Sequence, residues 1–289
     1  MLKVIKSIYL WFDSSGDLPN LQNKTKIDWL RCSPFILLHV FCFAVFFVKF
    51  EWSLLLVLLI TYVLRVFSLT AFYHRFFSHR AFKTSRVMQF IFAFIGTTAT
   101  QRGPLWWAAH HRHHHKHTDR ALDRHSPHVH GFLWSHCGWF LSAENFKTDL
   151  SYIKDLSKFP ELRFLDRYDI VPPIILAVTL YWFGGWPYVV WGYFISTVLI
   201  YHVTFAINSL GHTVGTQSFK TADHSRNNWL LAIFAFGEGW HNNHHHCPSS
   251  ARQGRTLWQL DISYLILKLM EKFKLVWDLR EFDVKENQV

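Results

Sequence analysis

The chain has 289 residues, of which 50% are hydrophobic and 18% aromatic, and its thirty Lys and Arg against twenty Asp and Glu give a net charge of +10. This apolar yet basic composition excludes an ordinary soluble protein and predicts apolar spans joined to a basic, water-facing part. No nucleic-acid partner is expected, because no recognition motif accompanies the charge. The four cysteines form no CxxC pair, which indicates neither a zinc ribbon nor a disulfide framework.

The first apolar runs predict a helical hairpin in a lipid bilayer. Residues 34–50 are almost wholly apolar and long enough for a marginal span, and residues 54–73 form a second run that only Arg65 interrupts. Residues 1–30 are read as a polar lead-in rather than a cleaved signal peptide. The next apolar stretch, 87–100, is short for a span, so we expect it to be an interfacial or buried helix.

A second hairpin is predicted from residues 170–183 and 187–207, with its turn at Gly184-Gly185-Trp186-Pro187. Lys and Arg concentrate outside the two hairpins and are nearly absent from their turns, so the positive-inside rule puts both termini and the polar parts in the cytoplasm. The predicted fold is therefore an all-α integral membrane protein of a single domain, 1–289. It has four transmembrane helices in two hairpins and a cytoplasmic helical cap made of residues 74–169 and 208–289.

Twelve of the twenty histidines lie in three boxes. The first, His74 to His79, is an HxxxxH directly after the second span, and residues 110–117 and 241–246 each contain HxxHH. On a helix, positions i, i+3 and i+4 share one face, so each HxxHH is expected to aim three imidazoles at one point. A spacing of five is not a same-face pair. His74 and His79 should therefore reach different metal ions, unless the helix ends between them.

The spacing in the second box allows two sets of ligands, which are His110, His113 and His114 or else His111, His114 and His115. Asn208 and His212, four residues apart where the last span ends, form a weaker fourth element. Six surplus histidines are read as ordinary solvated side chains: His113, His117, His125, His128, His130 and His246.

Eight or nine imidazoles exceed the four ligands that one zinc ion takes, so they suit two transition-metal ions. Imidazole binds several metals and does not select among them. An apolar membrane setting favours iron that activates O2 against an unactivated C–H bond. A His-rich metal transporter is the alternative from another class, but transporters place polar ligands inside their spans, whereas these boxes lie just outside.

Five segments resemble the membrane fatty acid desaturases, particularly the Δ9 branch that includes stearoyl-CoA desaturase: residues 73–79, 107–115, 131–139, 208–212 and 237–245. The family pattern His-Arg-x-His-His favours the second frame of box two. The resemblance implies two non-haem iron ions, with one of them bound by Asn208 through a water and the pair held by these ligands: His74, His79, His111, His114, His115, His212, His241, His244 and His245.

The resemblance also implies a reaction in which O2 and two supplied electrons remove two hydrogens from a saturated acyl chain, leaving a cis double bond at Δ9. A related di-iron hydroxylase on the same scaffold is the nearest alternative. The electrons would come from a separate ferredoxin or cytochrome b5, because the chain has no His-Pro-Gly-Gly segment of a fused cytochrome. The acyl chain would lie in a tunnel lined by aromatic residues such as Trp107.

The sequence departs from the animal acyl-CoA enzymes beside box two. Those enzymes usually carry a basic and an acidic residue where this chain has Ala109 and His110, and Arg102 is the substitute that this sequence offers. The acyl carrier is therefore left open between coenzyme A, a lipid and a carrier protein. The form of the second and third boxes resembles bacterial members, which places the protein in a bacterial inner membrane with its active site facing the cytoplasm.

Overall fold

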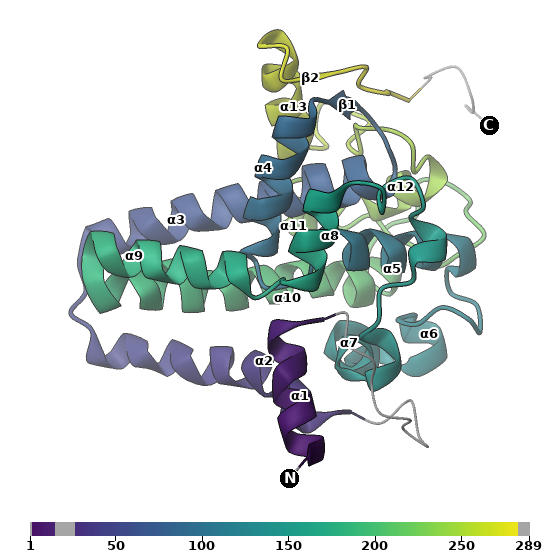
Figure 1. Ribbon diagram of the computed structural model, residues 1–289. Helices are drawn as coiled ribbons and strands as arrows, with labels where there is room; N and C mark the ends of the chain where they lie inside the picture. The colour runs from purple at the N-terminus through teal and green to yellow at the C-terminus, as the bar shows by residue number, and fades with distance from the viewer. Residues whose placement is uncertain (1, 15–26, 283–289) are drawn as a thin grey trace.

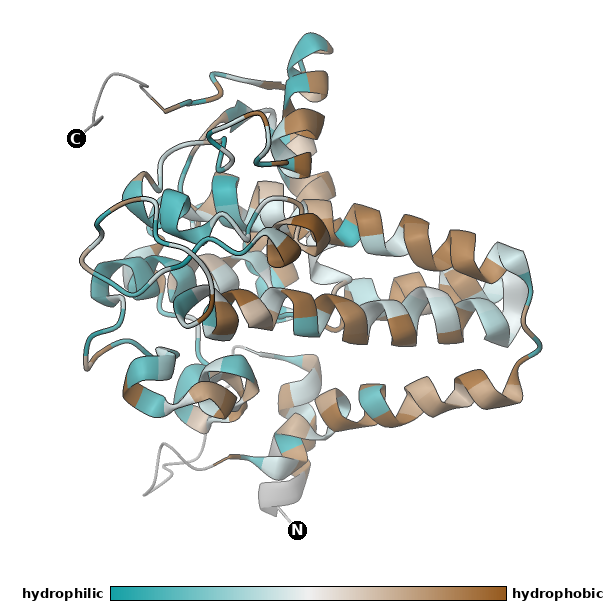
Figure 2. Cartoon of the chain, turned by 180° about the vertical axis from the view of Figure 1, so that it is seen from behind, coloured by the Kyte–Doolittle hydropathy of each residue, from teal (hydrophilic) through white to brown (hydrophobic). Residues whose placement is uncertain are grey.

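The computed structural model describes residues 2–14 and 27–282, and its architecture is a sheaf of long helices that projects from a bundle of short ones (Figure 1). Hydropathy divides the molecule in the same way, since the long helices are mostly apolar and the bundle is mostly polar (Figure 2). Three helices are long and apolar enough to cross a membrane: Trp29–Phe47, Trp52–Ser78 and Val171–His212. Part of the expected polar lead-in, residues 15–26, lies outside the described residues.

The first candidate span begins earlier than the apolar run predicts. Helix α2 (Trp29–Phe41) starts after Asp28, whose side chain accepts a hydrogen bond from the backbone N–H of Arg31 at 3.2 Å, and it continues as the 3₁₀ helix η1 (Cys42–Phe47). An N-terminal cap of this kind satisfies a backbone donor that the helix leaves free. The capping residue, rather than the first apolar residue, therefore sets the boundary.

The second candidate span also runs further than predicted. Helix α3 (Trp52–Phe67) passes without a break into the π-helix η2 (Ser68–Ser78), so His74 lies inside a helix and not after it. Most of η2 is buried, and it packs against helices α4 (Arg86–Thr97) and α5 (Pro104–His117). Packing within the protein thus extends the helix past the end of its apolar sequence. The stretch 87–100 is helical as expected, in α4.

The third candidate span is interrupted by two glycines. Helix α9 (Val171–Val189), π-helix η6 (Val190–Ile195), α10 (Ser196–Ser209) and the 3₁₀ turn η7 (Leu210–His212) follow one another, but the backbone is non-helical at Gly184 and Gly185. Gly185 has φ +64°, which residues with a side chain rarely adopt. The chain turns back at this point, and Leu180 packs against Gly192 on the returning leg (Figure 1).

Short elements make up the remainder of the described chain. They are helices α1 (Leu2–Phe12), α6 (Pro127–His130), η3 (Trp134–Gly138), α7 (Trp139–Leu141), η4 (Ala143–Asn145), η5 (Leu150–Tyr152), α8 (Pro160–Arg167), α11 (Trp229–Phe234), α12 (His241–His246) and α13 (Ile262–Lys272), and the antiparallel strands β1 (Lys83–Thr84) and β2 (Val276–Trp277). The two-residue strands are a small departure from the all-α prediction. The main core surrounds η2, where Phe72, Tyr73 and Phe77 are fully buried.

Candidate metal centre

Four separate parts of the chain bring nine imidazoles together into two neighbouring groups. The five-histidine group contains His74, His79, His111, His115 and His244, whose ring nitrogens lie within 4.8 Å of one another. The four-histidine group contains His114, His212, His241 and His245 under the same limit. Every histidine of the nine-residue set expected from the sequence therefore falls in one of the two groups. Asn208 lies one helical turn before His212 and lines an adjoining cavity.

The two HxxHH boxes do not each converge on one point, which corrects that part of the sequence prediction. In α5, His111 and His115 enter the five-histidine group, while His114 enters the four-histidine group. In α12, His241 and His245 share the four-histidine group, and His244 joins the other. Residues i and i+4 are nearly in line on a helix, whereas i+3 lies on the other side of that line. Each box therefore serves both groups.

The two histidines of box one lie at the C-terminal end of the π-helix η2. The backbone N–H of His79 donates to the carbonyl of His74 at 3.3 Å, a bond between residues five apart, and helix η2 ends at Ser78. Bonds of this spacing are characteristic of a π-helix. They place His74 and His79 over one another with ring centroids 4.9 Å apart, in the same group. Of the two sequence alternatives, the structure agrees with the helix ending between them rather than with separate metal sites.

Buried asparagines fix the short helix α12. The side-chain Oδ1 of Asn242 accepts the backbone N–H groups of Ser218 and Phe219 at 2.8 Å each, and the side-chain Nδ2 of Asn243 donates to the backbone carbonyl of Gln253 at 2.9 Å. A helix of six residues has little stability of its own. These bonds tie it to two flanking loops, so the residues between the histidines of box three hold the box in place.

Four carboxylates that were not predicted from the sequence pair with Nδ1 atoms of the clustered histidines. The Nδ1 atoms of three ligands in the four-histidine group lie beside aspartates, at 2.9 Å for His114 and Asp123, 3.0 Å for His212 and Asp119, and 2.9 Å for His245 and Asp223. In the five-histidine group, Glu238 pairs with Nδ1 of His74. A carboxylate in this position keeps the proton on Nδ1 and leaves the Nε2 lone pair free to bind a metal. Acidic residues close to the boxes were the available sequence signal.

The electrostatics favour neutral imidazoles at three ligands of the five-histidine group, whereas burial acts to lower the pKa of His114 in the other group but Asp123 outweighs it and raises that pKa. Burial, followed by the neighbouring imidazoles, holds the pKa values of His111, His115 and His244 well below their usual range. Burial acts to raise the pKa of Asp123, but His114 outweighs it and the pKa of that carboxyl lies well below its usual range. Neutral rings backed by ionised carboxylates are the state that binds a metal cation.

The nitrogen positions also fit metal binding. The Nε2 atoms of His74 and His244, His79 and His111, His115 and His244, and His212 and His241 lie 3.0, 2.8, 2.9 and 3.0 Å apart. Two ligands at right angles, each about 2.1 Å from a metal, would be separated by about 3 Å. Among the described residues, the buried Nε2 of His245 has no hydrogen-bond partner. Where the proton of each ring is on Nδ1, two Nε2 lone pairs face one another at this distance and could bind one cation.

The remaining histidines divide into two kinds. His113 and His117 lie beside each other on α5, away from both groups, and His246 stacks on Phe219. His125, by contrast, is only 5% exposed and its ring stacks on His114 at 4.3 Å, so the sequence prediction of a solvated side chain is wrong for it. The loop after α5 packs against the second histidine box and buries His125 next to Asp123.

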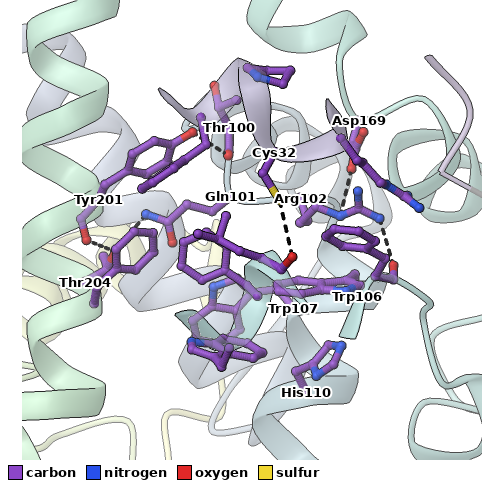
Figure 3. A pocket seen from close by; sticks show the side chains of 18 of the residues that line it. Cys32, Thr100, Gln101, Arg102, Trp106, Trp107, His110, Asp169, Tyr201 and Thr204 are labelled. Atoms are coloured by element: carbon purple, nitrogen blue, oxygen red, sulfur yellow. Dashed lines mark hydrogen bonds and ion pairs between the residues drawn. The ribbon is translucent and has the colours of Figure 1, made fainter. Parts of the chain in front are cut away.

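A cavity of about 210 Å³ adjoins the five-histidine group (Figure 3). Its walls come from α1, the start of α2, the loop before α5, α5 itself and α10, and they include His111 and Asn208. Trp107 lines it too, with its ring stacked on that of His111 at 5.0 Å. An elongated apolar ligand in this cavity would therefore pass directly beside a histidine of the group.

Arg102 lies in the same wall but does not present a free charge. Its side chain pairs with Asp169 at 3.3 Å and donates to the Phe146 carbonyl at 3.0 Å (Figure 3). Arg102 has φ +69° in the loop that leads into α5. The charge expected from the sequence to replace the missing basic residue is thus neutralised within the protein.

Comparison with known proteins decides the family. The family model described as fatty acid desaturase matches residues 23–262. The chain belongs to the fatty acid desaturase family. An acyl-CoA 5-desaturase of Anemone leveillei is 39% identical over 92% of this chain and 86% of its own length. This desaturase chain is also similar to an sn-1 stearoyl-lipid 9-desaturase of Anabaena variabilis (35% identical, 92% of this chain and 98% of the relative) and to Delta-9 acyl-lipid desaturase 1 of Arabidopsis thaliana (37%, 88% and 84%).

Membership in this family agrees with the resemblance expected from the boxes. The family, the three apolar helices and the clustered histidines together make the chain a membrane desaturase with groups that can bind metal. The relatives include Δ5, Δ7 and Δ9 enzymes and both acyl-CoA and acyl-lipid enzymes.

Proposed function

We propose that this desaturase uses O2 and two supplied electrons to introduce a cis double bond at Δ9 of a saturated acyl chain. The observation that carries the proposal is the contact between Trp107, in the wall of the apolar cavity, and His111 of the five-histidine group. Similarity to the Δ9 acyl-lipid enzymes of Anabaena variabilis and Arabidopsis thaliana supports the position of the bond.

The nine histidines would hold two iron ions, with Asn208 as a further ligand through a water. Iron in this site would supply the oxidant that removes hydrogen from an unactivated C–H bond. The protein's own part would be positional: the cavity would bind the acyl chain beside Trp107, whose ring stacks on His111, and burial would exclude water. Aspartates and Glu238 keep the protons on Nδ1. The reaction balances as two hydrogens from the chain, two electrons, two protons and one O2 giving two waters.

The proposed arrangement has four spans, because the two legs on either side of Gly184 would each cross the bilayer. Both hairpins would then return to the side that carries the histidines. Positive charge in the polar parts supports a cytoplasmic cap and cytoplasmic termini. A separate ferredoxin or cytochrome b5 would deliver electrons to the basic cap, and a bacterial inner membrane is the proposed location.

The test is expression in a host that lacks such an activity, followed by gas chromatography of fatty acid methyl esters. A new monounsaturated species is expected, and mass spectra of its dimethyl disulfide adducts should place the bond at Δ9. His244→Ala should abolish the product, whereas His246→Ala, on the same helix but outside both groups, should not. A hydroxy acid in place of the alkene would reject the reaction in favour of the hydroxylase.

Metal analysis of the detergent-purified protein complements the product assay. About two irons per chain are expected, and His244→Ala should lower this number. Zinc as the sole metal in a sample that forms product would contradict the proposed cofactor.

A further inference from the structure

Arg31 is a buried cation whose guanidinium has no acidic partner in the described part of the chain. It occupies the first turn of α2, its side chain turns into the cavity wall, and the residue is 7% exposed. Its guanidinium lies over the Phe146 ring, 4.2 Å from the centroid. Within residues 2–14 and 27–282, its buried Nη2 finds no hydrogen-bond acceptor. The ring covers one face of the guanidinium but satisfies none of its N–H groups.

Among the described residues, the neighbouring carboxylates Asp169 and Asp28 attract Arg31 electrostatically but form no ion pair with it. Asp169 pairs with Arg102 at 3.3 Å (Figure 3). Asp166 accepts the backbone N–H of Trp106 at 2.7 Å and the Thr148 hydroxyl at 2.8 Å, and burial raises its pKa to about 6. Asp28 caps α2. Arginine is rarely buried without a partner, because the unpaired charge loses its hydration and gains nothing in return.

The depth of Arg31 indicates where its partner would come from. It is the third residue of the first candidate span, and Trp29, two residues earlier, is 64% exposed. Exposed tryptophan at the end of a span is typical of the lipid head-group level. Arg31 is therefore at the depth where lipid phosphates lie, and it faces a cavity that ends at the five-histidine group.

The chemistry of the possible acyl carriers indicates which of them could place a phosphate beside Arg31. In a phospholipid the glycerol backbone carries the acyl ester and the phosphate a few atoms apart, so both fit near the mouth of one cavity. In coenzyme A the whole pantetheine arm separates the thioester from the phosphates, and a galactolipid has no phosphate. Arginine binds phosphate through two parallel, charge-assisted hydrogen bonds.

On the basis of the proposed function, we infer that Arg31 binds the phosphate of a phospholipid whose acyl chain occupies the cavity, so that the substrate is a phosphatidyl lipid. Arg31 is a specificity-determining residue in this scheme, and it takes no part in the removal of hydrogen.

Lipid binding to the metal-free protein tests the inference without relying on activity. Native mass spectrometry would compare distearoyl phosphatidylglycerol with distearoyl monogalactosylglycerol, supplied in equal amounts in detergent. The wild-type protein should retain the phosphatidyl lipid in about ten-fold or greater excess, the size expected of hydrogen bonds to a charged group. Arg31→Met should bring the ratio close to one, and Arg31→Lys should give an intermediate value.

Two controls separate recognition from folding. Arg163→Met removes an exposed charge of α8 and should leave the ratio unchanged. Without lipid, Arg31→Met should unfold at a temperature no lower than the wild type, because it removes an unpaired buried charge. If Arg31→Met keeps the wild-type ratio, or if stearoyl-CoA displaces the phosphatidyl lipid from the wild type at equal concentration, the inference is overturned.

Activity then distinguishes this inference from the proposed function. The wild type should desaturate the phosphatidyl lipid, with Arg31→Met raising KM about ten-fold and leaving kcat unchanged. A wild type that desaturates none of the three carriers would reject the proposed function, while the binding ratio would still decide the role of Arg31.

Discussion

Replacing Asp223 by Asn should weaken metal binding through His245 without touching a ligand. One carboxylate oxygen of Asp223 lies 2.9 Å from Nδ1 of His245, and the other accepts the Ser225 N–H and the Thr221 hydroxyl at 3.0 Å each. An asparagine that keeps its carbonyl on the Ser225 N–H turns its NH2 toward His245. The imidazole must then accept at Nδ1 and carry its proton on Nε2, where that proton blocks the metal.

The expected loss is about 10-fold to 100-fold in metal affinity, or about 1.4 to 2.7 kcal/mol. Anaerobic titration of the metal-free protein with Fe(II) would measure it, with metal content checked by mass spectrometry. Glu161→Gln is the matched control, since it breaks the pair of Glu161 with Arg86 away from both groups. An Fe(II) affinity within two-fold of the wild type would refute the argument that Asp223 fixes the tautomer.

Three further outcomes follow from the packing and charges. Burial acts to raise the pKa of Asp155, but hydrogen bonds from Arg112 and Arg80 lower it to about 2. The ionised Asp155 should therefore stabilise the fold fully above pH about 4. The difference in melting temperature between the wild type and Asp155→Asn should disappear as the pH falls from about 4 to 2. Gly96→Ala would put a methyl group into the Tyr73 ring and should lower the free energy of unfolding by about 1–3 kcal/mol, measured by thermal unfolding. An unchanged stability would disprove the close contact. Fe(II) at 100 times its dissociation constant should stabilise the fold by about 2.7 kcal/mol, and a chelator should reverse the shift.

The sequence predicted which histidines gather but not how they are divided. Spacing within each HxxHH indicates a shared helix face, and that reasoning cannot tell one metal position from two neighbouring ones. The split of His111 and His115 from His114 depends on where the imidazoles of α12 meet those of α5, which is a tertiary contact. The aspartates behind the rings were missed because acidic residues near a histidine box are common, and only the fold shows which of them reach Nδ1.

Helix ends were predictable only where apolar sequence and packing coincide. The turn at Gly184 and Gly185 falls where glycines permit it. The extension of the second span to Ser78 was not foreseen, because η2 is buried by other helices and so needs no run of apolar residues. Arg31 shows the same limit: nothing in the sequence indicates that a basic residue at a span end turns inward, away from solvent.

The π-helical winding of η2 makes the length of box one and the shape of the backbone interdependent. A π-helical turn joins residues five apart and so holds one residue more than an α-helical turn. This wider turn brings His74 and His79 together although five positions separate them. Deleting a single residue between His74 and His79 would therefore leave an HxxxH spacing that an ordinary α-helical turn also brings together. The deletion would require this turn to become α-helical, which would shift every side chain that follows it. The number of residues between the two histidines and the type of helix that carries them can therefore change only together.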